Sequence, residues 1–252
     1  MKITFLGTGT SQGVPVIACE CKICTSTDTK DKRLRSSVMI ETGGNNFVID
    51  TGPDFRYQML RAKVKKLDAV ILTHAHKDHI AGLDDVRAFN FIQKKAIDVY
   101  AKDDVCKQIR NEFSYAFSIY KYPGVPEINL HAIDTSFMIN DVKIIPINVM
   151  HMQLEIFGYR IEDFTYITDA NYISDKEKEK IKGSKVVVLN ALRKKKHVSH
   201  FNLEEAVSLL KELKPERAYL THISHMMGLH EDVEKELPDF IKIAYDKLTI
   251  DI

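Results

Sequence analysis

One stretch carries most of the information about this chain: residues 69–79 read AVILTHAHKDH. Its first five residues form an apolar run that is typical of a buried strand. Its last six contain four side chains that bind metals in proteins, namely His74, His76, Asp78 and His79. Imidazole and carboxylate together suit zinc, iron or manganese. One histidine in a polar loop would mean little, but four ligand-type residues in this pattern favour a metal site.

The segment HAHKDH, read as HxHxDH, resembles the signature of the metallo-β-lactamase-fold hydrolases. This resemblance implies an α/β fold, the αββα sandwich, in which two mixed sheets are flanked by helices. It also implies further ligands at the ends of later strands, where site-building residues are expected in an α/β fold. The implied ligands are His74, His76 and His151 for one metal and Asp78, His79 and His222 for a second, with Asp169 bridging both.

Four further segments resemble one branch of that family, the cyclic phosphodiesterase of phosphonate breakdown (PhnP) and its relatives. They are FLGTGTSQGVPVIACECKIC at 5–24, DTG at 50–52, GLDDVRAFN at 82–90 and YLTHISH at 219–225. In that branch a Cys-x-Cys-x-x-Cys motif and a histidine near the C-terminus bind a structural zinc. The matching residues are Cys19, Cys21, Cys24 and His225, with His230 left open as the fourth ligand.

The chemistry implied by this resemblance is hydrolysis at two metals. Two cations about 3.5–4 Å apart lower the pKa of a shared water towards about 7, so a metal-bridging hydroxide is the expected nucleophile. The resemblance places a general acid at His200, with His197 as the alternate proton donor. Asp78 is counted as catalytic as well as a metal ligand. Arg33 and Arg35 follow the cysteine loop and are expected to bind the substrate's phosphate. His197 is also expected to contact the substrate or to orient His200.

Composition narrows the class of protein. The 252 residues are 44% hydrophobic, which is ordinary for a globular protein and excludes collagen-like and disordered classes. The 36 basic and 35 acidic side chains nearly cancel, so there is no strong nucleic-acid signal. No apolar run reaches the roughly 20 residues that span a bilayer, and the N-terminus does not resemble a signal peptide. We therefore expect a cytoplasmic protein without a membrane partner, in which a disulfide is disfavoured.

Strand-like and helix-like stretches alternate, which predicts an α/β class and a single domain over residues 1–252. The predicted strands are 3–6, 38–41, 47–50, 69–73, 142–149, 157–161, 165–168, 185–190, 217–221 and 248–252. The predicted helices are 54–62, 80–93, 103–113, 175–182 and 202–213. Asn45-Asn46 after Gly43-Gly44 predicts a hairpin turn, and Asp246-Lys247 predicts a second hairpin.

These features predict a binuclear metal-dependent phosphodiesterase that acts on a small or cyclic phosphodiester. Its expected cofactors are two divalent cations, zinc or manganese with iron left open, and one structural zinc. A nuclease of the tRNA 3′-processing type and a thioester hydrolase stay open as alternatives. A non-enzyme alternative is a metal-binding protein of cofactor biosynthesis that resembles the pyrroloquinoline quinone pathway relative. The expected partner is a small anionic phosphodiester, and a homodimer is left open.

Overall fold

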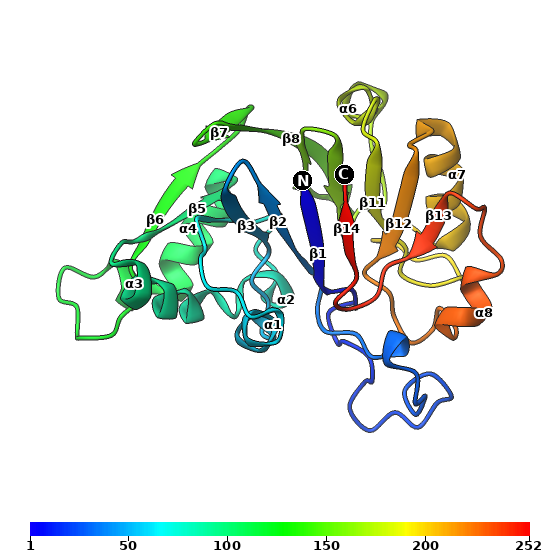
Figure 1. The fold of residues 1–252 in the computed structure, drawn as a ribbon, viewed down its shortest axis with the longest axis horizontal. Helices are drawn as coiled ribbons and strands as arrows, with labels where there is room; N and C mark the ends of the chain where they lie inside the picture. The colour runs from blue at the N-terminus through cyan, green and yellow to red at the C-terminus, as the bar shows by residue number, and fades with distance from the viewer.

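The computed structural model describes residues 1–252 and places its strands in two sheets that pack face to face (Figure 1). In spatial order, the first sheet consists of β14 (Thr249–Asp251), β1 (Lys2–Gly7), β2 (Ser37–Thr42), β3 (Asn45–Ile49), β4 (Ala69–Ile71), β5 (Ile97–Ala101) and β6 (Ile128–Ala132). The second consists of β13 (Ile241–Ile243), β12 (Arg217–Thr221), β11 (Val186–Asn190), β10 (Phe164–Ile167), β9 (Leu154–Ile161), β8 (Val142–His151) and β7 (Phe137–Ile139).

Both sheets are mixed, and they are built in the same way. β14, β1, β2 and β3 pair antiparallel, whereas β3, β4, β5 and β6 pair parallel. In the second sheet β7 to β10 pair antiparallel and β10 to β13 pair parallel. Parallel neighbours need a crossover connection, and helices supply most of these crossovers. The carboxyl ends of the parallel strands therefore lie at one edge of the sandwich, where their loops can meet.

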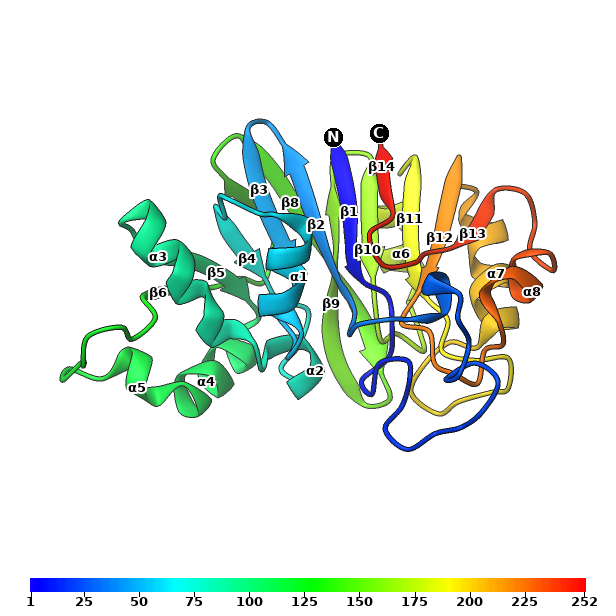
Figure 2. The same ribbon diagram turned by 60° about the horizontal axis from the view of Figure 1, so that its bottom comes forward.

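Helices cover the outer faces of both sheets, as expected for the αββα sandwich. Figure 2 shows α1 in front of strands of the first sheet, α3 and α4 towards one end of the molecule, and α7 and α8 at the other end. The helices are α1 (Phe55–Ala62), α2 (Lys77–Ile80), α3 (Arg87–Gln93), α4 (Asp103–Glu112), α5 (Ser114–Phe117), α6 (Asp175–Ile181), α7 (Leu203–Leu213) and α8 (His230–Glu234). Two 3-10 helices, η1 (Thr29–Asp31) and η2 (Leu83–Val86), complete the set. No helix is both long enough and apolar enough to cross a membrane.

Three apolar layers hold these elements together. One layer of 22 buried residues lies between the first sheet and its helices, and another of 22 lies between the second sheet and its helices. The third, of 21 residues, fills the space between the sheets and includes the fully buried Tyr159 and Tyr166. The Tyr159 hydroxyl donates a hydrogen bond to the Leu72 carbonyl at 2.7 Å, which fastens β9 of the second sheet to the end of β4 in the first.

Some predicted elements were right and others were wrong. The helix predicted at Asn202 begins there with a capping box, because the Asn202 side chain accepts from the Glu205 N–H and Glu205 accepts from the Asn202 N–H. The helix predicted over 80–93 is instead split among the end of α2, η2 and α3. The split occurs at Gly82, where a Cβ atom would lie 2.2 Å from the Gly52 carbonyl oxygen. The backbone at Gly82 packs directly against the backbone at Gly52, and the predicted helix is interrupted at this contact.

The two predicted hairpins had different outcomes. Gly43 and Gly44 form the first turn with φ of +55° and +74°, and Asn45 is already in β3 opposite Thr42. The second hairpin is wrong, because β13 belongs to one sheet and β14 to the other. The segment between them crosses the sandwich, and the buried Asp246 holds it there by accepting backbone N–H bonds. The short strands β5, β6, β7 and β13 were not predicted.

Candidate metal centre

The predicted ligands gather at the edge where strands of both sheets end. β4 leads into HAHKDH, β8 ends at His151, β10 leads to Asp169 and β12 leads to His222. Asp169 and His222 have φ of 59° and 58°, in the left-handed region that residues other than glycine rarely adopt. Such a conformation costs roughly 1–2 kcal/mol per residue and is concentrated at functional sites. The chain therefore turns sharply at two strand ends to aim these side chains inward.

Four of these residues form one compact group. The ligand atoms of Asp78, His79, Asp169 and His222 all lie within 4.8 Å of one another. His222 Nε2 is 3.0 Å from Asp169 Oδ1, and His79 Nε2 is 3.1 Å from Asp78 Oδ2. Both Nε2 atoms are nevertheless buried without a hydrogen bond, because they do not point directly at these oxygens. Buried polar atoms are rarely left unpaired, so two such nitrogens in one compact group of ligand atoms fit a site for a divalent metal ion.

Three histidines form a second group beside the first. The ring of His76 lies 4.6 Å from that of His74 and 5.1 Å from that of His151. His74 Nε2 is buried without a hydrogen bond, as in the first group. Asp169 also lies within 4.8 Å of the ligand atom of His151. Its carboxylate thus lies between the two groups, in the place expected of a bridging ligand.

Hydrogen bonds behind the cluster fix the direction of these histidine rings. The fully buried Asp50 accepts from His79 Nδ1 at 2.7 Å and from Thr73 Oγ1 at 2.8 Å. Thr73 Oγ1 in turn lies 3.0 Å from His74 Nδ1, and His151 Nδ1 lies 2.7 Å from the Asp169 carbonyl oxygen. With Nδ1 occupied, Nε2 of each ring is free to bind a metal. Asp50 was not predicted as a site residue, although its motif DTG had been noted.

The charges of the group are strongly coupled. Burial alone would raise the pKa of Asp169, but His222 and His79 hold it well below its usual range. Burial opposes a charge on His222, yet Asp169 and Asp78 outweigh it and raise the pKa of His222 to about 9. The pKa of His79 is likewise raised well above its usual value, by Asp169 and Asp50 against the effect of burial. Without a metal, the protonated imidazoles of His79 and His222 supply the positive charge that balances these carboxylates. A bound metal ion would supply that charge instead.

The two candidate proton donors lie one behind the other. His200 Nε2 is 3.0 Å from Asp169 Oδ1, and its ring stacks on that of His222 at 4.9 Å. His197 Nδ1 is 3.3 Å from His200 Nδ1, on the side away from that carboxylate. Burial lowers the pKa of His200 to about 4, although Asp169 favours the protonated ring. The structure therefore brings His200 to the cluster and places His197 next to it.

The two arginines differ from expectation. Arg33 is only 4% exposed, and its guanidinium donates to Thr8 Oγ1 and the Ala244 carbonyl and contacts His230 Nδ1 at 3.2 Å. The expectation that Arg33 binds substrate is therefore wrong, because it is a buried link between the two ends of the chain. Arg35 is partly exposed and bonds Asp54 through one Nη atom, so a contact with substrate stays a prediction.

The cysteine motif forms a separate group. The sulfurs of Cys19, Cys21 and Cys24 lie 3.3, 3.5 and 3.5 Å from Nδ1 of His225. The backbone N–H of Cys24, donated to the sulfur of Cys21, lowers the pKa of the Cys21 thiol to about 6. Three thiols and one imidazole at such distances fit a tetrahedral zinc site. The structure brings His225 to the cysteines, whereas His230 lies 2.8 Å from the Glu234 carboxylate.

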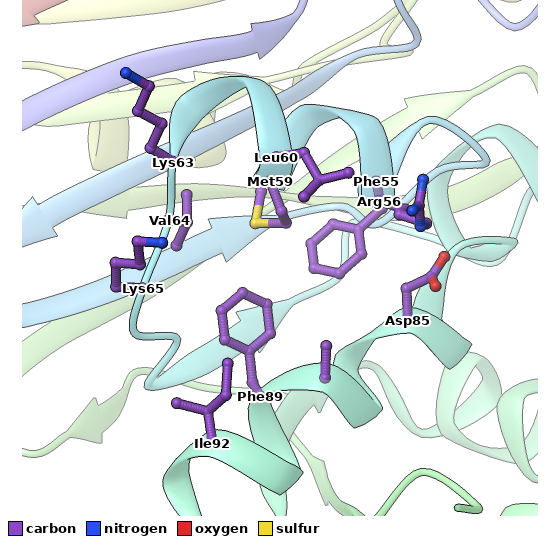
Figure 3. Close-up of a pocket in the computed structure, with 11 residues that line it drawn as sticks. Phe55, Arg56, Met59, Leu60, Lys63, Val64, Lys65, Asp85, Phe89 and Ile92 are labelled. Atoms are coloured by element: carbon purple, nitrogen blue, oxygen red, sulfur yellow. The ribbon is translucent and has the colours of Figure 1, made fainter.

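A hollow lined mainly by apolar residues lies apart from both groups. It has a volume of about 410 Å³ and lies between α1 and α3, as Figure 3 shows. Its lining is mainly apolar and contains neither histidine nor cysteine. Its residues are Phe55, Arg56, Met59, Leu60, Lys63, Val64, Lys65, Asp85, Ala88, Phe89 and Ile92. This hollow supplies no set of metal ligands.

Comparison with known proteins agrees with this geometry. The beta-lactamase superfamily domain matches residues 45–223, well over half of the chain. An octanoyltransferase of Porphyromonas gingivalis is 39% identical over 98% of this chain and 51% of that protein. A ribonuclease Z of Nostoc punctiforme is 27% identical over 65% of this chain and 47% of that protein. The chain thus spans about half the length of these two curated relatives.

A solved structure, described as a new diphosphatase from the PhnP family, resembles the chain along its whole length. It is 39% identical, has a TM-score of 0.93, and matches 100% of this chain and 97% of that chain. The superfamily match, this likeness and the strand-end ligands agree. The chain therefore belongs to the beta-lactamase superfamily, in the PhnP-like branch of its metal-dependent hydrolases.

Proposed function

We propose that the chain is a binuclear metal-dependent phosphodiesterase that acts on a small phosphodiester. The observation that carries this proposal is the completeness of the cluster: residues from four strand ends converge, and three buried Nε2 atoms are left without a hydrogen bond. Seven ligand groups would hold two divalent cations, zinc, manganese or iron. They are His74, His76 and His151 for one metal, Asp78, His79 and His222 for the other, and Asp169 between them.

Two divalent cations, when bound, supply an activated water and neutralise charge on the phosphoryl oxygens. The chain's own residues supply positioning and proton transfer. Asp169 holds the His200 ring through the 3.0 Å contact at Nε2 and favours its protonated form, although burial still lowers the pKa of His200 to about 4. His200 then stands where a departing alkoxide could take its proton, a role that typically contributes 10²–10⁴-fold to the rate. Ser199 Oγ, 2.8 Å from His200 Nδ1, keeps the ring in this orientation.

The cysteine group is proposed to bind a structural zinc. Its four protein ligands would complete a tetrahedral site and leave no position for a substrate. The site joins the loop at 19–24 to His225, 206 residues after Cys19. Its role would be to hold the N-terminal loop against the C-terminal end of the cluster.

A second candidate function is hydrolysis of a diphosphate bond. It is favoured by the likeness to the PhnP-family diphosphatase, which covers 100% of this chain. The same ligands and proton donor would serve, because both reactions displace an oxygen from phosphorus. Ribonuclease and thioester hydrolysis remain weaker alternatives. Octanoyl transfer, named for the P. gingivalis relative, is weaker still, because the chain matches only half of that protein.

A metal-reconstituted activity panel tests the proposal. The panel contains bis(p-nitrophenyl) phosphate, a 2′,3′-cyclic nucleotide, a dinucleoside diphosphate, a short RNA and a thioester, each with zinc, manganese or iron. We expect turnover of the diesters, with His222→Ala inactive. His131→Ala is the matched control, because His131 is an exposed histidine paired with Asp98 on the first sheet. Turnover of the diphosphate alone would select the second candidate, and turnover of no phosphoester would refute both.

A further inference from the structure

A small cleft opens directly beside the metal-ligand cluster. It has a volume of about 140 Å³, and two of the proposed ligands, His74 and His76, form part of its wall. His76 is the exposed member of its group, so the cleft reaches solvent beside the cluster. The other lining residues come from the loop at Ala75, from α4 and from β9: Ala75, Asp104, Val105, Gln108, Leu154, Glu155 and Ile156. A substrate bound at the cluster would have part of its structure in this cleft.

Apolar side chains line the cleft from two different elements. Val105 is buried on α4, and Ile156 is buried on β9. Leu154, 40% exposed, lies at the start of the same strand. Val105 and Ile156 offer a ligand little side-chain surface, whereas Leu154 and the partly exposed Ala75 form an apolar edge against which a flat ring can pack. A phosphate or a heavily hydroxylated group would gain little there.

The polar groups of the cleft are hydrogen-bond acceptors. Asp104 forms no ion pair, and only its Oδ1 is engaged, by the Val105 N–H at 2.9 Å. Gln108 uses its amide nitrogen on the Ala75 carbonyl and on Glu112, which leaves its carbonyl oxygen free. The charge of Glu155 is balanced by Lys102 at 2.8 Å. The cleft therefore offers a free carboxylate oxygen and a free amide oxygen, which attract N–H groups and repel anions.

The cleft also lies apart from the proton donor. The His151 ring lies 5.1 Å from His76, which borders the cleft, and 4.8 Å from His200. His151 thus separates the cleft from His200, so a group in the cleft does not displace the ring that would protonate the leaving oxygen. The two sides of the cluster can serve different parts of one substrate.

We propose that this cleft is a specificity site for a planar, amine-bearing ring on the substrate, such as cytosine or adenine. The inference rests on the proposed phosphoester hydrolysis and adds to it a substrate class, an ester that carries such a base. Asp104 accepts from the exocyclic amine, Gln108 accepts from a second N–H where the ring has one, and Leu154 and Ala75 contact the ring. A carbonyl in place of the amine, as in uracil, would face the Asp104 carboxylate and be rejected.

Kinetics with matched substrates test this inference. The substrates are 2′,3′-cyclic CMP, 2′,3′-cyclic UMP and bis(p-nitrophenyl) phosphate, and the variants are Asp104→Ala and the control Asp103→Asn. Asp103 is exposed on the same turn of α4 and pairs with Lys107. Wild type should favour the cytidine substrate by about tenfold in kcat/KM, the size of effect expected from the loss of one hydrogen bond at a partly exposed site. Asp104→Ala should abolish that preference through KM, whereas Asp103→Asn should keep it.

The outcomes distinguish failure of the proposed specificity site from failure of the proposed phosphodiester hydrolysis. Equal rates on both nucleotides by wild type, or an equal loss on all three substrates in Asp104→Ala, would overturn the specificity site while phosphodiester hydrolysis stands. Saturation-transfer NMR with free cytidine and uridine tests the cleft without turnover. Preferential binding of cytidine that is lost in Asp104→Ala supports the inference, and equal binding of both nucleosides overturns it. Absence of turnover on every diester refutes the proposed function alone.

Discussion

Replacing Asp50 with Asn probes how the fold controls the metal ligands. All three partners of this buried carboxylate are donors: the Thr73 N–H at 2.9 Å, the Thr73 hydroxyl at 2.8 Å and His79 Nδ1 at 2.7 Å. An amide has one oxygen and one NH₂ group, so its NH₂ must face at least one of these donors. If His79 accepts that N–H, its own proton moves to Nε2, the atom needed for metal. If Thr73 accepts it, the change passes to His74, whose Nδ1 lies 3.0 Å from the same hydroxyl.

The expected loss of metal affinity follows from the strength of the hydrogen bond that Asp50→Asn removes. A hydrogen bond to a charged group contributes about 1.5–3 kcal/mol, and partners behind a metal ligand typically change metal affinity by about 10–100-fold. These two values agree, because each factor of ten corresponds to about 1.4 kcal/mol. We therefore expect Asp50→Asn to weaken binding of the active-site metals by about 10–100-fold, with both His79 and His74 still present.

Competition with a chromophoric chelator measures this affinity, and thermal unfolding of the metal-free protein reports stability separately. The matched control is Asp68→Asn. Asp68 is also buried, accepts the Asn46 N–H at 2.9 Å, and lies just before β4, at the end of the strand away from Thr73. Metal affinity within about twofold of wild type in Asp50→Asn would refute the reasoning. An equal loss in both variants would show that general destabilisation, and not ring orientation, is the cause.

Three further predictions use the same cluster. Affinity of the metal-free protein for divalent cations should keep rising with pH to about 9 and beyond, because His222, whose pKa is raised to about 9, and His79, whose pKa is also raised, must each lose a proton before binding a metal; chelator competition across pH measures this. His200→Ala should slow diesters with poor leaving groups by about 10²–10⁴-fold but hardly affect p-nitrophenyl esters, as steady-state kinetics would show. Gly52→Ala should destabilise the fold by roughly 1–3 kcal/mol in thermal unfolding, because its Cβ would lie 2.0 Å from the Asp78 carbonyl oxygen.

Much of the cluster could be predicted because a short local segment resembles a family signature, and that resemblance implies where the remaining ligands lie. HxHxDH lies in one short segment, and the other proposed ligands each follow an apolar run. Asp50 was missed because its partners are 23 and 29 residues away. β3 and β4 pair in parallel with Ile49 opposite Ile71, so Asp50 follows its strand beside the segment that leads to Thr73. Only the register of that pairing, which the sequence pattern does not state, shows that a carboxylate stands behind His79.

Asp50 was a site residue that the prediction missed, whereas Arg33 was predicted as a site residue and is buried away from solvent. Its position after the cysteine loop favoured a substrate contact, since an exposed arginine near a metal site commonly binds phosphate. Its real partners include Ala244 and His230, which are 211 and 197 residues away. Burial of a guanidinium is costly unless its donors are satisfied, and here the C-terminal region satisfies them. Contacts between the two ends of the chain cannot be read from local patterns, and this is where the prediction failed.

Contacts between the chain ends also link the cysteine group to the cluster. Ile223, the residue after His222, donates its N–H to the Thr8 carbonyl at 2.9 Å, which ties β12 to the loop after β1. Two residues further on, His225 meets the sulfurs of the loop at 19–24. His222 itself has φ of 58°, a conformation that persists only when its surroundings fix it. A metal held by His225 would therefore restrain the same short segment that aims His222, so the structural and catalytic sites share one support.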